Sequence, residues 1–145
     1  MILFILTLLL QIPGDVSSYN STDYYVDQEA ITFADAQRIV KMTFDDPHQE
    51  LGKVIRGEKR ELNFDFINDG NEAIKIELVS ACECTTLDWP RKAVAPGEKG
   101  TIHAVFDSSE KEASETIEID IYLENTDPET NRPIMKIVSY TFEMD

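Results

Sequence analysis

The stretch Lys59-Arg60-Glu61-Leu62-Asn63-Phe64-Asp65-Phe66-Ile67 decides the fold, because apolar and polar side chains alternate along it residue by residue. Its apolar positions are Leu62, Phe64 and Phe66, and acidic or amide residues stand between them. A period of two is typical of a β-strand with one face buried and the other in water. This stretch therefore predicts a strand over residues 59–67 that contributes to a β-sheet core.

The residues that follow this strand are typical of a turn and a second strand. Asn68-Asp69-Gly70-Asn71 consists of residue types that tolerate positive φ, which favours a hairpin turn. After it, Ile74, Ile76 and Leu78 alternate with charged residues. We expect these two strands to form a hairpin whose second arm leads directly into the cysteine-containing stretch.

Further alternating stretches extend to the end of the chain. Ala95-Pro96-Gly97-Glu98 and Arg56-Gly57-Glu58 are expected turns, in which Glu58 and Glu98 are interpreted as solvated. Short strands separated by turns, each with one polar face, predict an all-β fold, an antiparallel β-sandwich of about seven strands over residues 39–145. The expected strands cover residues 39–44, 53–55, 59–67, 74–78, 101–107, 116–123 and 134–142.

The first 38 residues differ from the rest. Residues 2–10 form an apolar run that ends before Pro13, and small residues follow, so residues 1–18 resemble a secretory signal peptide. The run lacks the usual positive flank, since Arg38 is the first basic residue, and a buried strand or helix is the alternative. Residues 19–38 predict an N-terminal arm, and a short helix is compatible with residues 30–41.

Composition limits the class of partner. The chain has 145 residues, which suits one domain plus a leader. Its 13 Lys and Arg stand against 28 Asp and Glu, for a net charge of −15, so nucleic acid is not expected as a partner. The apolar run is far shorter than the roughly 20 residues of a membrane span, so no stable span is expected.

Both cysteines lie in Ser80-Ala81-Cys82-Glu83-Cys84-Thr85, close to the only tryptophan, Trp89. Four interpretations remain open for Cys82 and Cys84: buried free thiols, a local disulfide, a soft-metal site such as Cu(I), or a redox pair. A disulfide would need a kinked backbone, because extended i and i+2 residues lie near the upper limit of Cα separation for a bridge, about 6.8 Å.

The other candidate residues give little support for a metal. His103 falls on the outward phase of its strand, and His48 lies in an expected turn, so neither has ligand spacing to the cysteines. Trp89 is interpreted as part of the sandwich core or its rim. No catalytic constellation and no cofactor site are expected.

The order of these features resembles a bacterial envelope family catalogued as domain of unknown function 1573, an Ig-like sandwich related to Hydin-type domains. The matching residues lie at 51–58, 64–70, 82–85, 89–90 and 95–100, ahead of the strand that begins near residue 101. The family usually has Cys-Gly-Cys-Thr, where this chain has Glu83 between the cysteines. The resemblance implies an Ig-like sandwich, secretion, and a binding or scaffolding role without an established reaction.

We therefore expect a periplasmic or secreted, non-enzymatic module of the cell envelope. Its partner would be another envelope protein or surface component, contacted through a sheet edge or the end loops. The alternative is a protein that handles a thiolate-bound metal of the Cu(I) type, or acts in redox chemistry, through Cys82 and Cys84.

Overall fold

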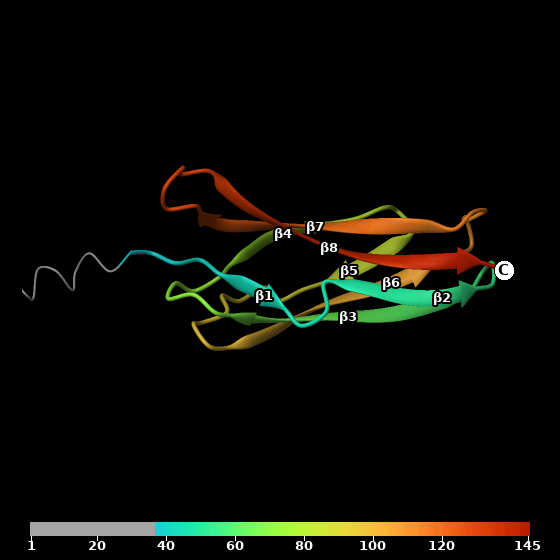
Figure 1. The fold of residues 1–145 in the computed structure, drawn as a ribbon, viewed down its shortest axis with the longest axis horizontal. Helices are drawn as coiled ribbons and strands as arrows, with labels where there is room; N and C mark the ends of the chain where they lie inside the picture. Colours follow the sequence, from blue (N-terminus) through green and yellow to red (C-terminus); the bar gives the residue numbers. More distant parts are fainter. Residues whose placement is uncertain (1–36) are drawn as a thin grey trace, which may run out of the picture. The chain divides into compact units, whose positions relative to one another are not determined.

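The computed structural model describes residues 37–145, and these residues form two four-stranded sheets packed face to face (Figure 1). The strand order is β1-β3-β6-β5 in one sheet, called the β3 sheet below, and β2-β8-β7-β4 in the other, called the β8 sheet. This architecture confirms the predicted all-β sandwich. The strands are β1 (Met42–Phe44), β2 (His48–Val54), β3 (Lys59–Asn68), β4 (Ile76–Ser80), β5 (Thr85–Asp88), β6 (Lys99–Asp107), β7 (Glu115–Thr126) and β8 (Pro133–Met144).

The core lies between the two sheets and is filled by the alternating apolar residues. Leu62, Phe64 and Phe66 of β3 are buried, as the sequence pattern predicts. The inward residues of β7 and β8 belong to the same core and have almost no exposed surface. Between the sheets, the ring centroids of Phe106 on β6 and Phe142 on β8 lie 4.5 Å apart. Burial of such side chains contributes about 1.5–3 kcal/mol each, which makes this layer the main source of stability.

The expected hairpin between residues 59–67 and 74–78 is wrong. β3 pairs with β1 and β6, whereas β4 pairs with β7 in the opposite sheet. The buried side chain of Asn68 explains the crossover: its Nδ2 donates to the carbonyl oxygens of Glu72 at 2.8 Å and Val94 at 2.9 Å. Its Oδ1 accepts from the backbone N–H of Gly70 at 3.0 Å. These bonds turn the chain out of the β3 sheet before a hairpin can close.

The start of the sandwich also differs from expectation. β2 covers His48–Val54, although the sequence pattern suggested only residues 53–55 and placed His48 in a turn. This strand pairs in parallel with β8, the last strand of the chain, so the sandwich is not wholly antiparallel. Most side chains of β2 are exposed or half-buried, and the alternation that marks an inner strand is therefore weak.

Residues 37–41 precede β1 and are not helical, so the part of the expected helix that the structure describes is wrong. Arg38 instead pairs with Glu72 through two bonds of 2.7 and 2.8 Å, and the N–H of Ile39 donates to Asn71 at 2.7 Å. The remaining residues of that helix, the predicted leader 1–18 and residues 19–36 lie outside the described residues. Within residues 37–145 no helix is long and apolar enough to cross a membrane.

Two turns at different places in the chain share one construction. The N–H of Glu58 donates to Ile55, and that of Glu98 donates to Ala95, each at 3.0 Å. Each glutamate carboxylate then accepts the N–H of the same partner residue, at 3.1 and 3.0 Å respectively. The glycine before each glutamate has a positive φ, of 87° and 79°. Glu58 and Glu98 therefore close their turns, a role that the interpretation as solvated residues missed.

Candidate functional site

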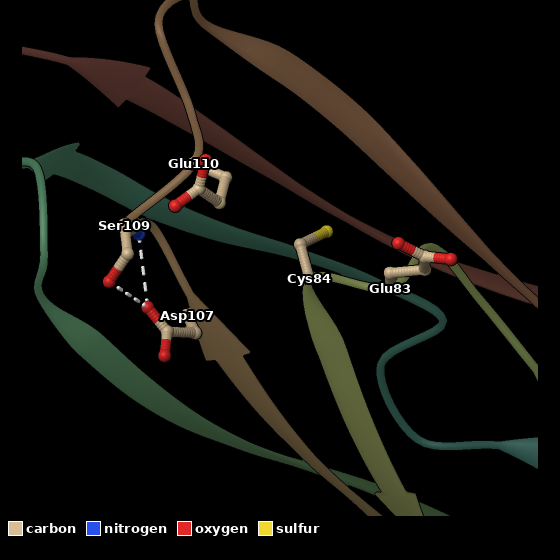
Figure 2. A pocket seen from close by; sticks show the side chains of 5 residues that line it. All are labelled: Glu83, Cys84, Asp107, Ser109 and Glu110. Carbon is tan, nitrogen blue, oxygen red and sulfur yellow. Dashed lines mark hydrogen bonds between the residues drawn. The ribbon is translucent and has the colours of Figure 1, made fainter.

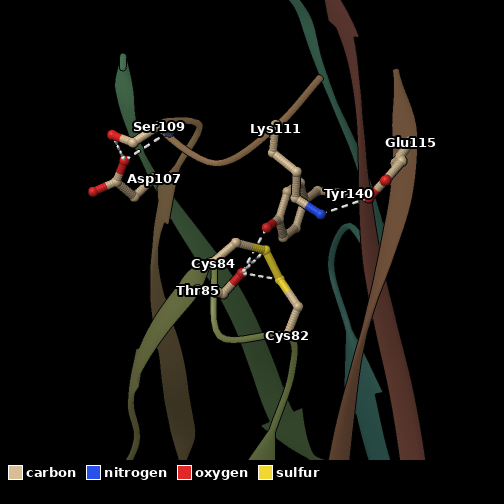
Figure 3. Close-up of a disulfide and its surroundings, with 8 residues drawn as sticks. All are labelled: Cys82, Cys84, Thr85, Asp107, Ser109, Lys111, Glu115 and Tyr140. Carbon is tan, nitrogen blue, oxygen red and sulfur yellow. Dashed lines mark hydrogen bonds and ion pairs between the residues drawn. A yellow bond between two sulfur atoms is a disulfide. The ribbon is translucent and has the colours of Figure 1, made fainter. Parts of the chain in front are cut away.

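The cysteine-containing loop connects β4 of the β8 sheet to β5 of the β3 sheet (Figure 3). Cys82 and Cys84 are joined by a disulfide, and their Cα atoms are 5.2 Å apart. The N–H of Thr85 donates to the carbonyl of Cys82 at 3.0 Å, which closes a four-residue turn. This turn supplies the kink that a bridge between residues i and i+2 requires.

Thr85 links the disulfide to the core. Its hydroxyl oxygen lies 3.4 Å from Sγ of Cys82 and 3.6 Å from Sγ of Cys84. The same oxygen lies 2.6 Å from the phenolic oxygen of Tyr140, which is fully buried in β8. Burial raises the pKa of the Tyr140 phenol above its ordinary value of 10.0, so this group stays a neutral hydrogen-bonding partner at physiological pH.

Beside the disulfide, an open pocket of about 380 Å³ is lined by Glu83, Cys84, Asp107, Ser109 and Glu110 (Figure 2). The Ser109 hydroxyl and N–H donate to the Asp107 carboxylate at 2.6 and 3.0 Å. These bonds, together with Lys59 at 3.2 Å, lower the pKa of Asp107 to about 2. The pocket therefore carries a fixed negative charge at Asp107 and two further acidic side chains around one sulfur.

Glu83 fits the turn without backbone strain, although the family that the sequence resembles usually has glycine there. Among residues 37–145, the one non-glycine residue with positive φ is Asn131, so Glu83 adopts an ordinary backbone conformation. Its side chain is exposed and faces the pocket (Figure 2). The glutamate thus adds charge to the pocket, and its backbone needs no positive φ in the turn.

The structure gives the cysteines no additional metal ligands. In the part of the chain that the structure describes, no three residues among His, Cys, Asp and Glu are arranged to hold a metal ion. His103 lies 3.9 Å from Glu61 on the outer face of the β3 sheet, and His48 lies on β2. Because Cys82 and Cys84 are bonded to each other, a Cu(I) site would need prior reduction, and the metal prediction stays a prediction.

A serine, a histidine and a carboxylate meet on the outer face of the β8 sheet, which the sequence pattern did not indicate. His48 Nδ1 lies 2.7 Å from Ser139 Oγ, and His48 Nε2 lies 3.0 Å from Glu50 Oε1. The His48 and Glu50 side chains are 46% and 70% exposed, and the Ser139 N–H is bonded to Pro47. The geometry suits a hydrogen-bonded seam between the parallel strands β2 and β8.

Trp89 lies at the rim of the core, as expected. It packs partly buried against the core residues, and the guanidinium carbon of Arg91 lies 3.8 Å from the centroid of its ring. This stacking is a cation–π contact that covers the outer face of the indole. Trp89 and Arg91 therefore close the end of β5.

Apolar side chains also gather on the outer face of the β8 sheet. Leu78, Met135 and Ile137 are 49%, 48% and 47% exposed. Leu78 is opposite Tyr122 of β7, and Tyr122 is opposite Met135 of β8. These four residues are named the outer apolar cluster below. The sequence pattern predicted an inward Leu78, and this was wrong because the register of β4 shifts between Ile76 and Leu78.

Solved structures with the same fold come from proteins of different kinds. The Vibrio cholerae VesB protease is 12% identical with a TM-score of 0.56, and the match covers 80% of this chain and 34% of that one. A Porphyromonas gingivalis protein of unknown function is 16% identical with a TM-score of 0.57, covering 73% of this chain and 46% of that one. The ASH/PapD-like domain 7 of human CEP192 is 10% identical with a TM-score of 0.57, covering 73% and 86%.

These similarities show the fold, which is an Ig-like and PapD-like β-sandwich. This chain spans about a third of the length of VesB and under half of that of the Porphyromonas protein. A search of curated proteins finds no match. The model of one protein family matches residues 42–137, more than half of the chain and nearly all of the sandwich. The chain belongs to the family described as protein of unknown function (DUF1573).

Proposed function

We propose that this chain is a secreted or periplasmic, non-enzymatic Ig-like module that binds or scaffolds another component of the bacterial cell envelope. The observation that carries the proposal is the outer apolar cluster, in which three large apolar side chains are about half exposed on one sheet. Contiguous apolar surface on a folded domain is typical of an interaction site. A bound partner would remove this surface from water.

The proposed compartment is supported by the disulfide and by the leader. Disulfides persist in secreted and periplasmic proteins and are rare in the reducing cytosol. The bond between Cys82 and Cys84 would therefore be stable outside the cytosol. The signal-like residues 1–18 support the same compartment.

Cross-linking and capture in cells that encode the chain test this proposal. The tagged protein is cross-linked in the cell and recovered from the envelope fraction, with a tagged unrelated secreted domain as the control. We expect a discrete second protein or surface component that the control does not recover. Recovery of nothing specific, together with hydrolysis of a substrate by the purified protein, would contradict the proposal.

A second candidate, thiolate chemistry at Cys82 and Cys84, is favoured by one observation. Cys84 lines a pocket with three acidic side chains, and their negative charge attracts a cation such as Cu(I). Titration of the reduced protein with Cu(I) tests this candidate. Affinity that is unchanged in the Cys82→Ser, Cys84→Ser double variant would exclude it.

A further inference from the structure

The outer apolar cluster extends across three neighbouring strands of the β8 sheet. Leu78, Tyr122 and Met135 form one cross-strand row, from β4 through β7 to β8. Ile137 belongs to the next row, beside Asp120 of β7. Since neighbouring strands lie about 4.8 Å apart, the row from Leu78 to Met135 is about 10 Å wide.

The irregular register of β4 creates this row. Ile76 is opposite Leu123, whereas Leu78 is opposite Tyr122, so one extra residue of β4 is accommodated between them. Such a bulge re-aims side chains, and here Glu77 and Leu78 are both exposed while Val79 returns to the core. Without the bulge, strict alternation would place Leu78 on the inner side with Ile76.

Acidic side chains border the cluster. Glu77 adjoins Leu78, Asp120 is opposite Ile137, and Glu118 is opposite Ser139 in the row beyond. Of the nearby cations, Lys75 is paired with Glu124 at 2.8 Å, and Lys136 stands on the inward phase of β8 between Met135 and Ile137. The whole chain has a net charge of −15. An apolar surface with an acidic border matches a partner that is apolar at its centre and basic at its edges.

The same charges disfavour two other occupants. A second copy of the chain would bring identical acidic borders together, and like charges across an interface oppose association. An anionic lipid surface would be repelled for the same reason. The partner is therefore expected to carry Lys or Arg beside its apolar residues.

The width of the cluster distinguishes between two shapes of partner. A strand added to the free edge of β4 would contact Leu78 but leave Met135 and Ile137 uncovered, and one added beside residues 133–138 of β8, which β2 does not pair, would leave Leu78 uncovered. A helix is about 10–12 Å across with its side chains, which matches the row. We propose that the outer apolar cluster is the docking face for a cationic amphipathic helix of a partner protein.

This inference rests on the proposed binding function and replaces the expected sheet edge or end loops by a sheet face. Photo-cross-linking from single positions tests it. Benzoylphenylalanine replaces Met135 on the cluster in one full-length protein and Asn63, on the outer face of the β3 sheet, in a control. Both proteins are irradiated in cells that encode the chain, and the adducts are sequenced by mass spectrometry.

We expect adducts from position 135, and not from position 63, on a segment of another protein with apolar residues at helical spacing and basic residues beside them. A synthetic peptide of that segment should bind Ile137→Lys about tenfold or more weakly than the wild type, and Glu61→Lys as tightly. Equal midpoints of thermal unfolding for the wild type and both variants show that the substitutions change binding and leave the fold intact.

Other results would overturn the inference. Adducts at position 135 on a second copy, on lipid, or on a segment without this pattern would contradict the proposed occupant, as would an unchanged affinity of Ile137→Lys. Adducts from position 63 alone would contradict the docking face but leave the proposed binding function standing. Adducts from neither position would contradict the docking face, and the capture experiment of the proposed function then decides separately whether a partner binds elsewhere on the chain.

Discussion

The Thr85 hydroxyl oxygen lies 2.6 Å from the phenolic oxygen of Tyr140 and joins the short edge strand β5 to the central part of β8 in the other sheet. The same hydroxyl contacts both sulfurs of the disulfide. The threonine after the second cysteine thus has a physical role, because it satisfies the one polar atom of a buried aromatic side chain. The cysteine-containing loop is positioned by this contact and by its own turn.

Removal of either hydroxyl should destabilise the fold. Tyr140→Phe and Thr85→Val should each lower the free energy of unfolding by about 1–2 kcal/mol. Each substitution removes one hydroxyl of the pair and leaves the other buried hydroxyl without this hydrogen-bond partner. The double variant should lose less than the sum of the two, which urea unfolding can measure. Tyr122→Phe, on the outer face, is the control and should change the free energy by less than about 0.5 kcal/mol. Additive effects of the two substitutions would contradict a direct bond.

Loss of the disulfide should have a small effect on stability. The bridge closes a loop of only three residues, for which chain entropy predicts about 2 kcal/mol or less. Reduced protein and the Cys82→Ser, Cys84→Ser double variant should therefore stay folded, with a cooperative urea transition at a slightly lower midpoint. Unfolding on reduction would show that the bridge holds more of the structure than its own turn.

Two glycines should not tolerate substitution even by alanine. A Cβ atom at Gly70 would overlap the carbonyl oxygen of Ile39, and one at Gly100 would overlap the buried ring of Phe66. Gly70→Ala and Gly100→Ala should each lower the free energy of unfolding by about 1–3 kcal/mol. Gly52→Ala is the control without steric overlap, since nothing lies within 4 Å of its Cβ position. Its positive φ alone should lower the free energy of unfolding by about 1–2 kcal/mol. A Phe66→Leu background should relieve the Gly100→Ala defect but not the Gly70→Ala defect.

Asp107 should contribute to acid sensitivity. Its pKa is about 2 in the folded chain and about 3.9 in an unfolded chain, so its ionised form favours the folded state above pH 4. This contribution should be lost as the pH falls from about 4 to about 2. Ser109→Ala should raise the pKa of Asp107 toward its ordinary value, as followed by carboxyl-carbon NMR, whereas Ser139→Ala on the other sheet should not. An unchanged pKa in Ser109→Ala would contradict the role of these bonds.

The long strands could be predicted from the sequence, because their inner residues alternate without interruption. Ile117, Ile119 and Ile121 of β7 and Ile102 and Phe106 of β6 are all buried as the pattern predicts. The sandwich follows from several such strands, each of which must bury one face. Local periodicity is sufficient here because each of these strands has neighbours on both sides.

The pairing of the strands could not be predicted, because it depends on contacts between distant residues. Asn68 lies in a stretch typical of a hairpin turn, yet its bond to Val94, 26 residues later, sends the chain to the other sheet. His48 meets Ser139 across 91 residues, and β2 has no clear alternation of its own. The outer position of Leu78 depends on a bulge, which a strict period of two excludes.

The central claim is that the outer apolar cluster binds the partner, and capture by a surface variant tests it most directly. Wild type, Met135→Lys with Ile137→Lys, and Glu61→Lys on the opposite face are each recovered after cross-linking in cells, and the captured partner is quantified by mass spectrometry. The account predicts that the double variant loses the partner about tenfold or more while Glu61→Lys keeps it, with equal thermal unfolding of all three. Equal capture by all three proteins would contradict it.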